Sequence, residues 1–185
     1  MKVLIWLVLG SFITPLALHA QTDAAPVTVN PVVWSAREIF TRQSKFISAA
    51  AEQMPADKYG YHPTADQWTF GKIVSHVAQA NNGVCAMLSD TPAPAGTPAG
   101  QKISDTDPKE TLVAAVNASL AFCDKALANL QDSKLGDTIT YFRGARVPRA
   151  RALVELTDDL EDHYSQMASY LRMNGMTPPS AKPKN

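Results

Sequence analysis

Four segments of the chain repeat their apolar residues at the 3.6-residue spacing of an amphipathic helix, and stretches rich in proline and glycine separate them. We expect helices over about residues 31–54, 68–88, 108–131 and 148–174. Pro55 ends the first helix, and Gly175 ends the fourth. Because no segment has a convincing strand pattern, the sequence predicts an all-α fold. We expect an antiparallel four-helix bundle with long connections that leave room for crossovers.

The expected connections hold most of the helix breakers. Residues 56–67 predict an ordered connection, and residues 132–148 predict an irregular one. Residues 90–107 contain three prolines and form a loop long enough to cover a cavity. Asp107 and Pro108 open the third helix, with an acidic cap followed by proline at the first helical position.

The expected core is clearest in the fourth helix. Its apolar stripe consists of Leu153, Leu156, Leu160, Tyr164, Met167 and Leu171. Trp34 and Trp68 stand near the starts of the first and second helices, and we interpret both as core anchors rather than as platforms for a ligand.

The N-terminus predicts export. Lys2 precedes an almost uninterrupted apolar run, and Ala20 is a small residue at which cleavage can occur. The run is too short for a comfortable membrane span of about 20 residues, so it is typical of a signal peptide, with a retained anchor as the alternative. We divide the chain into signal peptide, flexible lead-in, bundle and disordered tail, over residues 1–20, 21–30, 31–180 and 181–185. The expected location is periplasmic or secreted, with no stable membrane span after cleavage.

Two cysteines, Cys85 and Cys123, lie on different expected helices. An even number of cysteines in a chain bound for an oxidising compartment favours a disulfide, which would join the second helix to the third. Two buried free thiols are the alternative, since cysteine also packs well as a small apolar residue.

The candidate metal ligands are His76, Asp159 and His163. Asp159 and His163 are four residues apart on the fourth helix, so both side chains can reach one ion. On the second helix, Ala80 and Gly83 share a face with His76 and leave space beside its imidazole. The alternative is a half-exposed histidine and a favourable local Asp–His pair without metal. His62 lies in the connection before the second helix and is expected to be a surface or packing residue.

Four arginines cluster around the start of the fourth helix: Arg143, Arg146, Arg149 and Arg151. We expect them to form a solvated face or to pair with acids such as Glu155. The alternative is a site for an anionic substrate, because arginine binds carboxylates well. Their position near a helix N-terminus is unfavourable for the helix dipole.

The run from His163 to Pro179 resembles the C-terminal signature of the DinB/YfiT-like superfamily. The stretch from Met54 to Thr64, followed by Ser75-His76-Val77-Ala78, resembles the exported branch of that family. The resemblance implies a four-helix bundle in which three histidines bind one divalent metal ion. His76 and His163 match two of these histidines, and Asp159 stands where the family has the third. Two histidines and one carboxylate suit zinc, nickel or iron, but an aspartate there is also what a lost metal site would leave.

The sequence therefore predicts an exported DinB-like protein that binds a divalent metal ion. The resemblance implies a metal-dependent hydrolase or thiol-dependent transferase acting on a small molecule, and no residue identifies a catalytic group or the substrate. The alternative is a metal-free helical binding or structural module. The formal net charge of 0 falls to about −1 without Lys2, which does not favour nucleic acid as a partner. A homodimer is left open.

Overall fold

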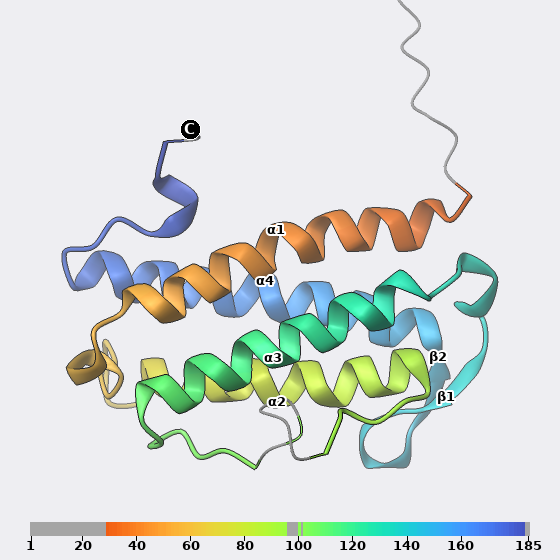
Figure 1. Cartoon of the computed structure of the whole chain (residues 1–185), viewed down its shortest axis with the longest axis horizontal. Coiled ribbons are helices and arrows are strands. Elements are labelled where there is room, and N and C mark those ends of the chain that lie inside the picture. The colour runs from red at the N-terminus through yellow and green to blue at the C-terminus, as the bar shows by residue number, and fades with distance from the viewer. Residues whose placement is uncertain (1–28, 96–99, 101, 184–185) are drawn as a thin grey trace, which may run out of the picture.

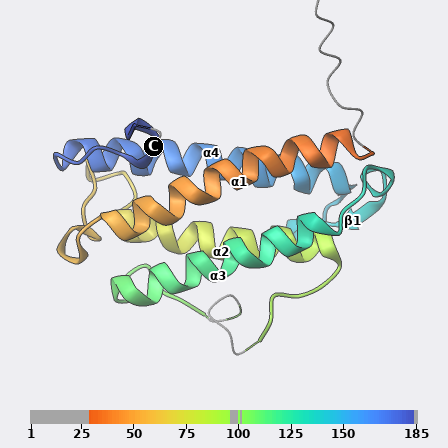
Figure 2. The same ribbon diagram turned by 45° about the horizontal axis from the view of Figure 1, so that its top comes forward.

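The structure is a computed structural model that describes residues 29–95, 100 and 102–183. The predicted signal peptide, most of the predicted lead-in and the last two residues lie outside the described residues. Four long helices make up most of the fold: α1 Pro31–Gln53, α2 Phe70–Ser89, α3 Lys109–Ala128 and α4 Arg149–Met173. They pack as a bundle in which α1 and α2 each contact both α3 and α4 (Figures 1 and 2). The predicted four-helix bundle is confirmed.

The direction of the helices shows the crossover that the sequence left open. In Figure 1, α2 and α3 run the same way, and α1 and α4 run together in the opposite direction. Because α2 ends at one end of the bundle and α3 begins at the other, the connection between them spans the length of the bundle and the two helices run parallel. The connections before α2 and before α4 each begin and end at the same end of the bundle, so they reverse the direction of the chain.

The helix ends follow the predicted breakers, with one exception. Gly175 has a φ of 73° and allows the chain to turn at the end of α4, where Met176 N donates to Leu171 O over 2.9 Å. At the start of α3, however, Pro108 is the residue that precedes the helix, and no side chain caps it. The Asp107 carboxylate instead accepts a hydrogen bond from the backbone N–H of Ser104 at 2.9 Å, so the predicted acidic cap is wrong.

A short hairpin occupies the segment expected to be irregular. Strand β1 (Thr138–Thr140) pairs antiparallel with β2 (Arg146–Pro148), with Ile139 opposite Val147. Arg143 and Gly144 turn the chain with φ values of 57° and 79°. Three-residue strands are too short to show a clear alternation, which is why the expectation of no strand is wrong here.

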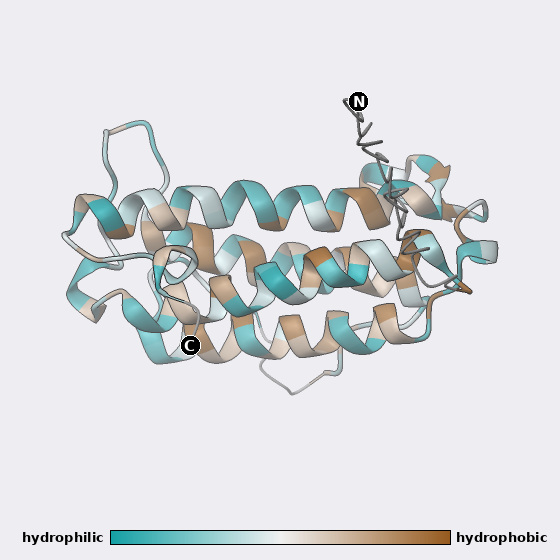
Figure 3. Ribbon diagram, turned by 90° about the horizontal axis from the view of Figure 1, so that it is seen from above, coloured by the Kyte–Doolittle hydropathy of each residue, from teal (hydrophilic) through white to brown (hydrophobic). Residues whose placement is uncertain are grey.

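The residues predicted to form the apolar stripe of the fourth helix lie in the core, but the two tryptophans predicted to lie there do not. Every residue of the predicted stripe on α4 is buried. Figure 3 shows apolar and polar residues alternating along the helices, as amphipathic packing requires. Among the described residues, α3 is long and apolar enough to cross a membrane, but its most apolar residues face the bundle core. Trp34 and Trp68 are 52% and 42% exposed, so their assignment as core anchors is wrong.

Cys85 and Cys123 form a disulfide, with their Cα atoms 5.2 Å apart. Both residues are completely buried, and they join the C-terminal halves of α2 and α3. The predicted bridge between the two helices is confirmed. The bridge agrees with the parallel direction of α2 and α3 in Figure 1, since both cysteines lie near the C-terminal ends of their helices.

The arginines at the start of α4 do not act as one group. Arg151 pairs with Glu155 at 2.7 Å, as predicted. Arg149 is buried and donates to the backbone oxygens of Met87 and Leu88 at 2.9 and 2.7 Å, and it pairs with Asp90 at 2.8 Å. The prediction that Arg149 is exposed to solvent is therefore wrong. The Arg149 charge lies at the C-terminal end of α2, where the helix dipole favours a cation.

Asp132 provides the N-terminal cap that α1 lacks locally. Its two carboxylate oxygens accept hydrogen bonds from Val32 N and Val33 N at 2.9 and 2.8 Å. We expect Asp132→Ala to lower the free energy of unfolding by about 1 kcal/mol, since two N–H groups at a helix start lose an anionic acceptor. Denaturant unfolding checks this, with Asp124→Ala on the exposed face of α3 as the matched control. Equal midpoints for both variants and the native chain would show that Asp132 does not cap α1.

Candidate metal centre

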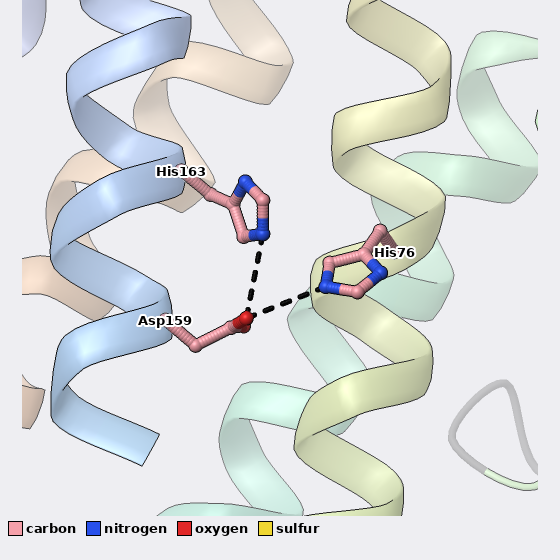
Figure 4. A group of neighbouring side chains, drawn as sticks. All are labelled: His76, Asp159 and His163. Carbon is pink, nitrogen blue, oxygen red and sulfur yellow. Dashed lines mark hydrogen bonds and ion pairs between the residues drawn. The ribbon is translucent and has the colours of Figure 1, made fainter. Parts of the chain in front are cut away.

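His76, Asp159 and His163 converge in the space between α2 and α4 (Figure 4). The Asp159 Oδ1 atom lies 3.3 Å from His76 Nε2 and 3.3 Å from His163 Nε2. One ligand atom from each of the three side chains lies within 4.8 Å of the other two. The structure therefore brings together all three residues that the sequence selected, whereas His62 is exposed and contacts Thr64 O.

The helices fix the three side chains at different depths. Asp159 and His163 occupy successive turns of one face of α4, and His76 faces them from α2. The side chains of His163, Asp159 and His76 are 8%, 23% and 35% exposed, respectively. His163 thus forms the inner end of the cluster, and solvent reaches the cluster on the side of His76.

The electrostatics of the cluster favour an ionised carboxylate. Burial alone would raise the pKa of Asp159, but the hydrogen bonds and charges of His163 and His76 outweigh it and lower the pKa to about 2. The Asp159 carboxylate is therefore ionised at every pH above about 4, which is the state that a metal ion requires of a carboxylate ligand.

The lowered pKa predicts how the metal-free protein responds to acid. The folded-state pKa of about 2 lies below the ordinary value of 3.8, so ionised Asp159 stabilises the fold above about pH 4. This stabilisation is lost as the pH falls from about 4 toward 2. We expect the difference in unfolding free energy between the native chain and Asp159→Asn to shrink over that window. Denaturant unfolding at a series of pH values measures it, and a difference that stays constant to low pH would contradict the assignment.

Two of the three separations between the ligand atoms fit a small metal ion. Two ligands bound at about 2.1 Å in tetrahedral geometry lie about 3.4 Å apart, and the observed separations from Asp159 Oδ1 are both 3.3 Å. The His163 Nδ1 atom is buried and has no hydrogen-bond partner among the described residues, and the Asp162 carboxylate lies 3.9 Å from it. Metal-bound histidines usually direct this second nitrogen at a carboxylate or carbonyl, so a small movement of Asp162 would complete the arrangement.

Trp68 borders the cluster, which the sequence did not indicate. Its ring stacks on His163 with centroids 5.7 Å apart and planes 17° apart, and its centroid lies 5.0 Å from that of His76. Tyr170 donates a hydrogen bond to the backbone oxygen of Trp68 at 2.9 Å. Trp68 precedes α2, so helical periodicity does not predict which way its side chain points. The only sequence signal for its place beside the cluster was that it lies shortly before His76 in the chain.

A cavity of about 310 Å³ adjoins the cluster. Its lining includes His76 and Asp159, together with Ala80, Phe142 and Glu155. Ala80 leaves space beside His76, as expected. The space at Gly83 is instead filled by the ring of Phe142, which a Cβ atom there would approach to 3.2 Å. Phe142 comes from the hairpin, so no pattern within α2 or α4 pointed to it.

A larger cavity of about 470 Å³ lies at the far end of α2, beside Arg149. Residues of the connection after α2 line it, including Thr91 and Pro92, so the described part of this loop does cover a cavity. None of the three candidate ligands borders it. The smaller cavity is therefore the one placed to serve the cluster.

Two histidines and a carboxylate converge between facing helices of the bundle. The fold and the site together therefore indicate a helical-bundle protein with a candidate divalent-metal centre. The family model described as the DinB superfamily matches residues 39–167. The chain therefore belongs to the DinB superfamily, as the sequence resemblance indicated. The matched region contains His76, Asp159 and His163.

Solved structures share the fold at low sequence identity. A DinB-like protein from Bacillus cereus matches with a TM-score of 0.63 at 16% identity, covering 79% of this chain and 95% of that one. A DinB-like protein from Bacillus subtilis matches with a TM-score of 0.62 at 17% identity, covering 82% and 99%. A mutant of the mycothiol-dependent maleylpyruvate isomerase matches with a TM-score of 0.59 at 15% identity, covering 73% of this chain and 60% of the isomerase. No curated protein sequence matches significantly.

Proposed function

We propose that this member of the DinB superfamily binds one divalent metal ion through His76, Asp159 and His163 and acts on a small molecule in the adjoining cavity. The observation that carries the proposal is the convergence of two imidazole nitrogens and one carboxylate oxygen within 4.8 Å of one another. Two of the three ligands also line the cavity of about 310 Å³. A bound molecule would therefore contact the metal site directly.

The donor set supports zinc, nickel or iron rather than magnesium or calcium, because imidazole nitrogen suits the later transition metals. Three protein ligands are what catalytic zinc sites provide, with a further position left for water or substrate. An ion held in this way supplies Lewis acidity and a nucleophile activated at neutral pH. Hydrolysis of a small molecule, or transfer involving a thiol, is the chemistry we propose. The fold shared with the mycothiol-dependent isomerase supports the thiol version by analogy only.

Calorimetric titration of metal-stripped protein, purified without a histidine tag, tests the proposal. We expect one equivalent of zinc, nickel or iron(II) to bind, with manganese the weakest of the four ions. Asp159→Asn should bind each ion more weakly, because the amide removes the anionic ligand without changing its size. If no ion binds, or if Asp159→Asn binds as well as the native chain, the proposed metal site is wrong.

The second candidate function is a metal-free binding module. It is favoured by one observation: Asp159 Oδ1 lies within hydrogen-bonding distance of both imidazoles, so the cluster holds together without an ion. Asp159→His restores the histidine that the family resemblance implies at this position. If the module is metal-free, the native chain takes up no ion and Asp159→His gains zinc binding.

We also propose that the protein is exported to the periplasm or secreted. The apolar N-terminus and the buried disulfide both support this, since disulfides persist in oxidising compartments. The intact mass of native material tests it. A chain that begins at or near Gln21 agrees with export, and a full-length mass contradicts cleavage.

A further inference from the structure

The cavity beside the candidate metal site is lined by acidic side chains but by no basic lysine or arginine side chain. Its ionisable lining residues are His76, Asp159 and Glu155, and no lysine or arginine is among the lining residues. Asn81 and Gln79 also line it, and the remaining walls are apolar: Ala80, Val84, Phe142 and Leu156. The cavity therefore offers carboxylates and amides around a short apolar passage.

Asn81 presents a hydrogen-bond acceptor that lacks a donor. Its side-chain nitrogen donates to Ser119 Oγ at 3.2 Å, and Ser119 Oγ donates to Val116 O at 2.8 Å. Because the single hydroxyl proton of Ser119 goes to Val116, Ser119 can only accept from Asn81, which fixes the orientation of the amide. The Asn81 Oδ1 atom is then buried with no hydrogen-bond donor among the described residues. This oxygen has almost no accessible surface, so a ligand in the cavity would reach it only if the side chain moved, which leaves Glu155 as the accessible acceptor at this end.

Glu155 supplies a charged acceptor at the same end of the cavity. It lies one turn before Asp159 on α4, and Asn81 lies five residues after His76 on α2. Since α2 and α4 are antiparallel (Figure 1), both are displaced in one direction from the metal cluster, by about 6–8 Å along the bundle. Arg151 is the ion-pair partner of Glu155, but its Nε and Nη2 atoms both bond to the same oxygen, Oε2. Arg151 itself does not line the cavity.

We propose that the cavity selects a small molecule with a cationic amine at one end and a metal-binding group at the other, and that Glu155 is the residue that recognises the amine. The metal-binding end rests on the proposed function. The apolar walls contact the carbon chain between the two ends. An anionic group in place of the amine would meet the Glu155 carboxylate, which like-charge repulsion disfavours.

Three hydroxamic acids of nearly equal length test this inference on zinc-loaded protein. They are 3-aminopropanohydroxamic acid, butanohydroxamic acid and succinic monohydroxamic acid, which place a cation, a methyl group or an anion at the far end. We expect the amine to bind about tenfold more tightly than the neutral compound, because it gains a charge-assisted hydrogen bond, and the anion to bind most weakly. Bound zinc is measured for every sample before the titration.

Glu155→Gln should abolish the preference for the amine, because the carboxylate is lost and the Arg151 charge becomes unpaired. Glu38→Gln, on the exposed face of α1, is the matched control and should keep the preference. Equal affinities for the three compounds, or a preference that survives in Glu155→Gln, would overturn the inference while zinc binding stands. Absence of bound zinc in the native chain would instead show that the proposed function itself has failed.

Discussion

Replacing His163 by alanine is expected to lower the zinc affinity of the metal-stripped protein at least about a hundredfold. His163 is the most deeply buried of the three ligands, with 8% of its side chain exposed, and its ring is held against Trp68. Removing it leaves only His76 and Asp159, which come from different helices and do not enclose an ion. Competition with a chromophoric chelator measures the affinity.

His62→Ala is the matched control for His163→Ala. His62 is an exposed histidine in the connection before α2, and its imidazole is hydrogen-bonded to Thr64 O. Its removal should leave zinc affinity unchanged, and circular dichroism should show the same helix content for both variants. If His163→Ala and His62→Ala bind zinc equally well, the ion does not bind at the cluster between α2 and α4.

The double substitution Cys85→Ala and Cys123→Ala is expected to lower the free energy of unfolding by about 4 kcal/mol. The disulfide joins residues separated by 38 positions, and it encloses the crossover between α2 and α3. Without it, the unfolded chain gains the conformational freedom of that loop. For a domain of this size, the loss corresponds to a melting temperature lower by about 8–15 °C.

Denaturant unfolding of oxidised, reduced and doubly substituted protein measures this loss. Reduced native protein and the double variant should unfold at similar denaturant concentrations, both well below the oxidised protein. Alkylation without reductant should label neither cysteine. Labelling of two thiols, or equal stability of the oxidised protein and the double variant, would contradict the contribution that we assign to the disulfide.

The sequence predicted those parts of the fold that depend on short-range patterns. The stripe from Leu153 to Leu171 required α4 to bury one face, and that face is buried. The four-residue spacing of Asp159 and His163 placed two candidate ligands on the same face of one helix. His76 was different, because spacing within α2 says nothing about which neighbouring helix it faces. The small residues beside His76 suggested that it could face Asp159 and His163 across a pocket, and the family resemblance gave most of the support for that pairing.

The remaining features depend on contacts between segments that are distant in the chain. Trp68 borders the cluster because the connection before α2 passes α4, and Phe142 reaches Gly83 because the hairpin folds back over α2. Arg149 is buried because the crossover brings the end of α2 beside the start of α4. Helical periodicity carries no information about any of these contacts between distant segments. Trp68 was therefore predicted to be in the core because it is hydrophobic, and Arg149 was predicted to be at the surface because it is charged.

The geometry of the cluster is compatible both with a bound metal ion and with a metal-free arrangement. The two separations of 3.3 Å suit ligands of a tetrahedral ion, and they also suit hydrogen bonds from the histidines to Asp159. The two cases differ in what lies between the three side chains. A measurement that locates an ion therefore distinguishes them better than any further measurement of stability.

Anomalous diffraction at the zinc absorption edge, from crystals of zinc-loaded protein, is that measurement. We expect one peak between α2 and α4, about 2.0–2.2 Å from Nε2 of His76, an oxygen of Asp159 and Nε2 of His163. The peak should be absent from crystals of His163→Ala grown in the same way. An anomalous map with no peak at the cluster, or with zinc only at surface residues, would contradict the metal site.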